Sequence, residues 1–144
     1  MPVLIILSVV VLLAVSGCDK SVPGTDYMLS ASQVESDTDA AERGDSEATK
    51  RLAFHFGLIG KKVLSQRYLS KCISMRNPEC LAEGANEAFA RYLDNSTSSD
   101  EKARYLSLAI KLNHEALVNA DPQDLAKIRG YQAQGRTFLS EKAQ

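Results

Sequence analysis

Two cysteines, Cys72 and Cys80, lie eight positions apart in the segment KCISMRNPEC, on either side of an Asn-Pro pair. Paired thiols can ligate zinc, exchange electrons or form a structural disulfide. A zinc site usually takes its four ligands from close pairs of Cys or His, and both histidines are far away in the sequence. Redox pairs usually have two residues between the cysteines, whereas seven stand here. The spacing therefore disfavours metal binding and redox catalysis, and the cellular compartment bears on whether a disulfide persists.

Other reactive side chains lack the neighbours that catalysis requires. His55 lies in AFHFG, and His114 stands beside Glu115, although neighbouring residues on a helix point apart. The sequence contains no Gly-x-Ser-x-Gly, phosphate-binding loop or HExxH segment. We therefore expect no catalytic residue, metal site or cofactor, and a protein that is not an enzyme.

The first eighteen residues, MPVLIILSVVVLLAVSGC, combine an apolar run with a terminal cysteine. From Val3 to Val15 the only polar residue is Ser8, and the run is shorter than the ~20 residues of a membrane-spanning helix. It has the length of the apolar core of a signal peptide. Small residues follow this core, as they do in signal peptides.

The segment Val15-Ser16-Gly17-Cys18 resembles the lipobox of bacterial lipoproteins, in which an aliphatic residue and two small residues precede the acylated cysteine. The resemblance implies that residues 1–17 are a lipoprotein signal peptide and that Cys18 becomes a lipidated N-terminus, for example with palmitate. The chain would then face the periplasm from a membrane. Asp19, directly after the cysteine, resembles a retention signal and favours the inner membrane.

This compartment bears on the remaining cysteines. Disulfides persist in the periplasm, and Cys72 and Cys80 are an even remainder once Cys18 carries lipid. An even number fits one bridge and leaves no free thiol.

Residues 18–34 contain a Pro-Gly pair and many small polar residues, which predicts a tether, and residues 35–144 are predicted to form one α-helical domain. Ala, Leu, Glu, Lys and Arg are plentiful there, which favours helix over strand. Capping residues and apolar periodicity predict helices over residues 39–44, from 45 to about 57, and from 61, 77, 99 and 121 onward. In the helix that Ser99 opens, the predicted apolar stripe is Ala103, Leu106, Ala109, Ile110 and Leu117.

Two parts of this domain align with an offset of about 32 residues. Ala41 then matches Ile73, Gly44 matches Arg76, and Ala48 matches Cys80, while a weaker third copy starts at Tyr105. The first copy resembles the Sel-like repeat, a helix-pair relative of the tetratricopeptide repeat, at Ala40, Ala41, Gly44, Ala48, Leu52, Phe56 and Gly60.

The Sel-like resemblance implies an all-α fold in which antiparallel helix pairs stack into a short solenoid and leave a concave face for a partner protein. Tyr68 takes the aromatic position of the second copy, and Gly84 stands where the repeat has Leu. Cysteine-rich Sel-like repeat proteins carry a disulfide across the same seven-residue gap, so the resemblance also implies a Cys72–Cys80 bridge.

Charge is unevenly distributed along the chain, although the formal net charge is only −1. Seven acids and one base occur from Asp26 to Glu47, and seven bases and no acid occur from Ala48 to Pro78. Such a run can be a solvated surface paired with acids in space, or a face that meets an acidic partner or anionic lipid. The candidate partner-binding residues are Lys61, Lys62, Arg67, Lys71 and Arg76.

The sequence thus predicts a lipid-anchored, periplasm-facing protein-binding module that acts as an adaptor or scaffold, with no affinity for nucleic acid. Two alternatives remain open. One is an immunity or inhibitor lipoprotein that neutralises a toxin reaching the periplasm. The other is a cell-wall or β-lactam-acting hydrolase, an activity proposed for cysteine-rich relatives of the repeat.

Overall fold

The computed structural model of the chain describes residues 27–130 and is all-α over that range. The labelled helices are α1 (Ala31–Glu42), α2 (Ser46–Leu58), α3 (Lys62–Ser74), α4 (Pro78–Leu93) and α5 (Ser99–Asn119), and a further helix covers 122–130. Consecutive helices pack against each other, so the predicted all-α fold of stacked helices is confirmed. The predicted signal peptide and Cys18 lie outside the described residues.

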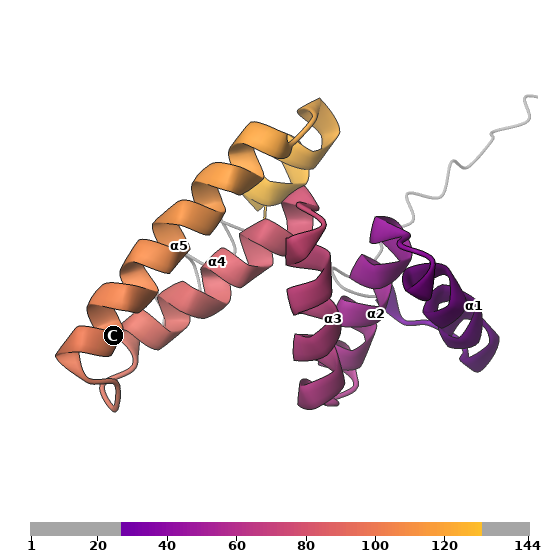
Figure 1. Ribbon diagram of the computed structural model, residues 1–144, viewed down its shortest axis with the longest axis horizontal. Helices are drawn as coiled ribbons and strands as arrows, with labels where there is room; N and C mark the ends of the chain where they lie inside the picture. Colours follow the sequence, from indigo (N-terminus) through magenta and orange to yellow (C-terminus); the bar gives the residue numbers. More distant parts are fainter. Residues whose placement is uncertain (1–26, 131–144) are drawn as a thin grey trace, which may run out of the picture.

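The helices form two antiparallel pairs that meet at an elbow (Figure 1). Helices α2 and α3 form one arm, with α1 packed on α2, and helices α4 and α5 form the other arm. The elbow is the turn between α3 and α4, and the tip of the first arm is the turn between α2 and α3. The two arms enclose an angle, whose inner side we call the inner angle.

Helix α1 begins at Ala31, eight residues before the predicted start and inside the segment expected to be a tether. Ser30 caps this helix and forms a reciprocal capping box with Gln33, which satisfies two backbone N–H groups. The folded part also includes Tyr27, whose hydroxyl donates to Glu79. Residues 27–34, expected to belong to the tether, are therefore part of the folded domain.

Three helices end in the same way, at positions 16 residues apart. Gly44, Gly60 and Arg76 have φ angles of 92°, 75° and 58°. In each case this residue and the one after it donate backbone hydrogen bonds back into the last helical turn. Gly44 and Arg76, which the 32-residue offset aligns, thus occupy equivalent positions at the ends of two helices. The residues that follow them, Asp45 and Asn77, both cap the next helix.

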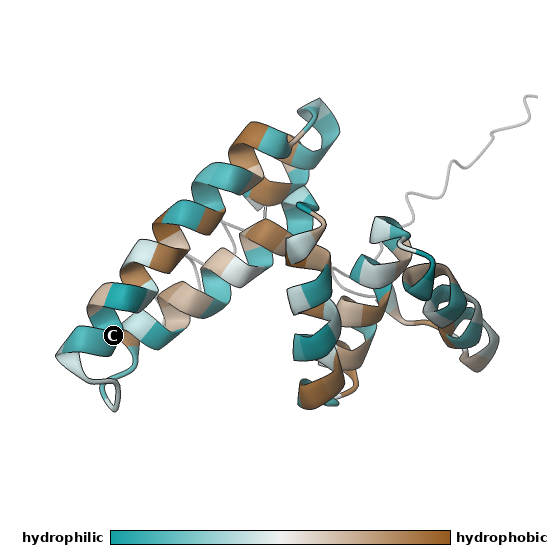
Figure 2. Ribbon diagram, in the orientation of Figure 1, coloured by the Kyte–Doolittle hydropathy of each residue, from teal (hydrophilic) through white to brown (hydrophobic). Residues whose placement is uncertain are grey.

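The apolar stripe predicted for α5 is only partly correct. Ala109 is buried together with Leu112 and Ala116, whereas Ile110 is 63% exposed and Leu117 is 41% exposed. Positions 109, 112 and 116 follow the helical period and face α4, whereas Ile110 points about 100° away from Ala109. Figure 2 shows brown, apolar segments along α5. The helix begins at Ser99, as predicted, and Ser98 caps it.

Close packing at the elbow explains an unexpected glycine. A Cβ atom on Gly84 would lie 2.6 Å from Cδ1 of Ile73 and 3.2 Å from Cδ1 of Leu112. A side chain at position 84, where the Sel-like pattern has leucine, would therefore force Ile73 at the end of α3 to shift. Cys72, Cys80 and Leu69 form the adjoining buried cluster with Ala53 of α2.

Candidate partner-binding groove

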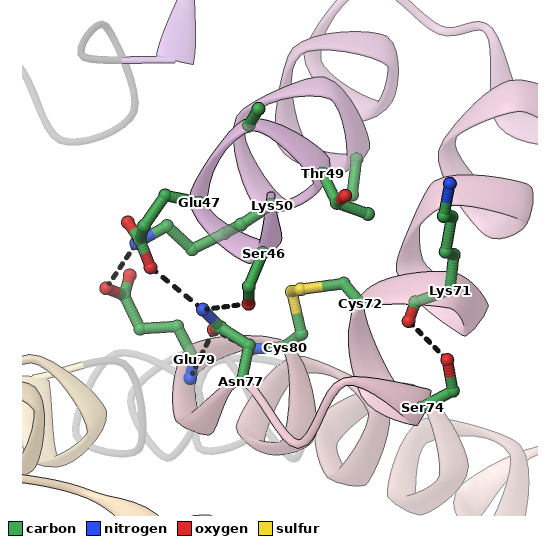
Figure 3. The surroundings of a disulfide bond; sticks show 12 residues. Ser46, Glu47, Thr49, Lys50, Lys71, Cys72, Ser74, Asn77, Glu79 and Cys80 are labelled. Carbon is green, nitrogen blue, oxygen red and sulfur yellow. Dashed lines mark hydrogen bonds and ion pairs between the residues drawn. A yellow bond between two sulfur atoms is a disulfide. The ribbon is translucent and has the colours of Figure 1, made fainter. Parts of the chain in front are cut away.

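The disulfide between Cys72 and Cys80 is present and fully buried. It joins the last turn of α3 to the first turn of α4, with a Cα–Cα distance of 5.9 Å, as the yellow bond in Figure 3 shows. Because the two helices meet end to end at this point, the bridge fixes the elbow. The structure therefore confirms the predicted pairing.

A buried carboxylate lies beside the disulfide. Glu79 is 2% exposed, and its Oε1 accepts from Lys50 Nζ at 2.9 Å and from Lys127 Nζ at 3.1 Å. Lys50 also pairs with Glu47 at 2.6 Å, and Tyr27 donates to the other oxygen of Glu79 at 2.9 Å. This cluster, which we call the Glu79 hub, joins the N-terminal segment, α2, α4 and the helix over 122–130.

The charges of the hub stabilise one another despite their burial. Burial opposes ionisation of Glu79, but hydrogen bonds and charge attraction from Lys50 outweigh it and lower the pKa of this carboxyl. Burial likewise opposes the charge of Lys50, but Glu47 and Glu79 outweigh it and raise the pKa of the ammonium. Both groups are therefore ionised at neutral pH, and the hub is an ion-pair network that positions the arms.

Asn77 connects the cap of α4 to the start of α2. Its side-chain oxygen accepts from the N–H groups of Glu79 and Cys80, and its Nδ2 donates to Ser46 Oγ and Glu47 Oε1 (Figure 3). The side-chain amide of Asn77 therefore caps α4 and also hydrogen-bonds to the first turn of α2.

The five basic residues predicted to bind a partner do not form one face. Lys62 and Arg67 are exposed on α3 but point about 140° apart, because they are five positions apart on a helix. Lys71 is partly buried, and its Nζ donates to the carbonyl of Ala41 at 2.7 Å. Arg76 lies in the elbow turn. Lys61 is at the tip of the first arm, with its Nζ 6.0 Å from the ring centroid of Phe56.

A groove of about 380 Å³ opens on the inner angle. It lies between α2 and α3 on one side and α4 on the other, and this volume is within the ~300–1,000 Å³ typical of ligand sites. Its lining residues are Tyr27, Ala53, Phe54, Gly57, Leu58, Ser65, Leu69, Glu83 and Glu87. The lining is apolar and aromatic, with two carboxylates and no basic side chain.

The frame of the groove is well fixed. The rings of Tyr27 and Phe54 contact each other with centroids 4.7 Å apart, and Tyr27 is held by the Glu79 hub. Ser65 Oγ donates to the carbonyl of Ala53 at 2.9 Å, which joins α3 to α2. A Cβ atom on Gly57 would lie only 3.2 Å from that Ser65 oxygen. Helices α2 and α3 are therefore in close contact where they line the groove.

The two carboxylates of the groove are one helical turn apart on α4 and repel each other. Burial, and then the charge of Glu87, raise the pKa of Glu83. A cation brought into the groove would relieve this repulsion. Sequence reasoning missed these acids because their significance depends on α2 and α3, which fold over them.

The tip of the first arm exposes three apolar side chains. Leu58 is 51% exposed, Ile59 40% and Val63 81%, and Lys61 and Lys62 lie between them in sequence. We call Leu58, Ile59 and Val63 the apolar tip. Figure 2 shows brown segments at the end of this arm.

The histidines contribute to packing or lie at the surface. The backbone N–H of Leu29 donates to Nδ1 of His55, which is buried, at 3.1 Å, so this ring holds the N-terminal segment against α2. His114 is exposed on α5. Within residues 27–130, no group of three or more His, Cys, Asp or Glu side chains could hold a metal ion. Over the same range, no helix has the length and apolar character needed to cross a membrane.

Comparison with known proteins does not identify a family. The chain matches no protein-family model, no curated protein and no solved structure.

Proposed function

We propose that this chain is a membrane-anchored helical-repeat module that binds another protein and performs no chemistry of its own. In this proposal Cys18 carries the lipid, and the domain faces the periplasm. The lipobox-like segment ending at Cys18 supports the anchor, and a buried disulfide suits an oxidising compartment. The likeness to Sel-like repeats supports the binding role.

The groove on the inner angle is the observation that carries the binding proposal. It offers apolar side chains for contact area and two carboxylates for orientation, which is the usual make-up of a recognition site. The matching partner presents an apolar segment with a Lys or Arg. The guanidinium of Arg fits best, since it can pair with Glu83 and Glu87 and stack on the rings of Phe54 and Tyr27.

Affinity capture from cross-linked cells tests this role. The double variant Glu83→Gln, Glu87→Gln removes both groove charges and keeps the side-chain size. The matched control, Glu35→Gln with Glu42→Gln, removes two exposed acids of α1. We expect the wild type and the control to retain the same cross-linked protein, and the groove variant to lose roughly tenfold or more, the scale of one buried charge contact.

Equal capture by all three proteins would contradict the groove as the binding site. Capture of no protein at all by the wild type would contradict the binding role itself. Thermal unfolding checks that the groove variant still folds. We expect its midpoint temperature to be unchanged or slightly higher, because the substitutions remove a like-charge pair.

A further inference from the structure

The tip of the first arm combines exposed apolar side chains with lysines. The residues that line the binding groove do not include Ile59, Val63, Lys61 or Lys62. Ile59 lies at the C-terminal end of α2, and Val63 is in the first turn of α3. The turn between α2 and α3 lies at the end of the arm farthest from the elbow (Figure 1), and both side chains are exposed there. We infer that this tip contacts the surface of an anionic lipid bilayer.

Charge and apolar area at the tip both suit a membrane surface. Aliphatic side chains gain free energy when they leave water for the acyl boundary, and lysines beside them reach anionic headgroups with their ammonium groups. Among the described residues, no ion pair within 4 Å involves Lys61 or Lys62, so neither charge is neutralised by a carboxylate, although Lys61 also lies over the ring of Phe56. No acidic residue occurs between Ala48 and Pro78, which includes the whole tip.

The route of the chain brings the tip close to the proposed anchor. Cys18 and Tyr27 are nine positions apart, so the chain reaches at most about 30 Å between them. Tyr27 is in contact with Phe54, and Ile59, the C-cap of α2, lies five positions farther along the chain, or about 8 Å. An anchored domain thus has its tip within reach of the bilayer. The anchor raises the local concentration of lipid at the tip, so that a contact too weak to bind alone is populated.

The inference rests on the part of the proposed function that places the chain at a membrane, and its test separates the two. The sequence contains no Trp, so one introduced tryptophan is a unique fluorescent reporter. The Ile59→Trp variant of the full chain places it at the tip, and Ile110→Trp places it on the exposed side of α5, where Ile110 is 63% exposed. Both are reconstituted in vesicles of phosphatidylglycerol and phosphatidylcholine, with bromine on the phosphatidylcholine acyl chains.

We expect bromine to quench the tryptophan at position 59 and shift its emission to shorter wavelength, while the one at position 110 is unaffected. Quenching at position 59 falls in vesicles of phosphatidylcholine alone, and it falls likewise when Lys61→Gln and Lys62→Gln are added. The Val63→Trp variant repeats the measurement if Ile59→Trp disturbs the fold.

Two results would overturn the inference. If the chain stays with the vesicles and neither position 59 nor position 63 is quenched, the tip is free of lipid, although the anchor stands. If the chain does not sediment with the vesicles, the anchor and the tip contact both fail.

Discussion

At the scale of single residues, Glu79 organises the molecule. Its carboxylate lies where α2, α4 and the helix over 122–130 meet, and it accepts from Lys50, Lys127 and Tyr27. Asn77 and Glu79 could be predicted as cap and first-turn acid of a helix, because that signal is local. The contact with Lys50 could not, because 29 positions separate the two residues and only the folded elbow joins them.

Removal of the hub carboxylate should destabilise the fold. We expect Glu79→Ala to lower the free energy of unfolding by about 3 kcal/mol, because it leaves the buried Lys50 ammonium with only Glu47 as its partner. The control Glu42→Ala, at an exposed site on α1, should change it by less than about 0.5 kcal/mol. Urea unfolding measures both, and equal effects would contradict the hub.

The hub also sets a pH window. The pKa of Glu79 is lowered in the folded chain, so its contribution is present above its ordinary value of 4.5 and is lost as the pH falls through the lowered value. The pKa of Lys50 is raised, so its contribution is present below 10.5 and is lost as the pH rises through the raised value. We expect Glu79→Ala to lose most of the acid-side dependence in urea unfolding curves, and an unchanged profile would contradict this assignment.

At the scale of helices, the sequence predicted the capped N-terminal ends of the helices better than it predicted which side of each helix is buried. Asp45, Asn77 and Asp121 were predicted as caps, and the structure confirms all three. The start of α1 was missed although Ser30 and Gln33 carry the capping-box signal, because the small polar residues before them suggested a tether. In α5 the buried side was misassigned, because Ile110 and Leu117 are apolar yet lie away from α4.

Within residues 27–130, Arg76 is the one residue with a positive φ angle at a helix end that is not glycine. Gly44 and Gly60 take the equivalent left-handed conformation without the Cβ strain that Arg76 incurs at φ 58°. We expect Arg76→Gly to raise the free energy of unfolding by about 1 kcal/mol. Arg67→Gly, at an exposed position within α3, should lower it by about 1 kcal/mol. Thermal unfolding would contradict this account if both substitutions destabilised the chain equally.

At the scale of the whole molecule, the elbow fixes the angle between the arms and thereby the groove. The Sel-like resemblance implied stacked helix pairs and the Cys72–Cys80 bridge, and the structure has both features. The groove could not be predicted in the same way, since its lining comes from the N-terminal segment, α2, α3 and α4 together. The predicted basic residues are dispersed by the folding of α3, which turns Lys62 and Arg67 to different sides.

Loss of the disulfide should loosen the elbow. We expect the double variant Cys72→Ser, Cys80→Ser to lower the free energy of unfolding by about 2 to 3 kcal/mol, the scale for so short a loop. Hydrogen exchange should accelerate most in the first turn of α4 and the last turn of α3. A uniform change over all helices, or none, would show that the bridge does not hold the elbow.

The central claim is that the domain works at a membrane through a lipid on Cys18. Intact-mass spectrometry of the protein extracted from membranes tests it most directly. The account predicts a chain that begins at Cys18 and exceeds the mass of the unmodified chain from Cys18 onward, less two hydrogens for the disulfide, by the mass of its attached lipid. A membrane-extracted chain that begins at Met1, or that begins at Cys18 without added acyl mass, would contradict it.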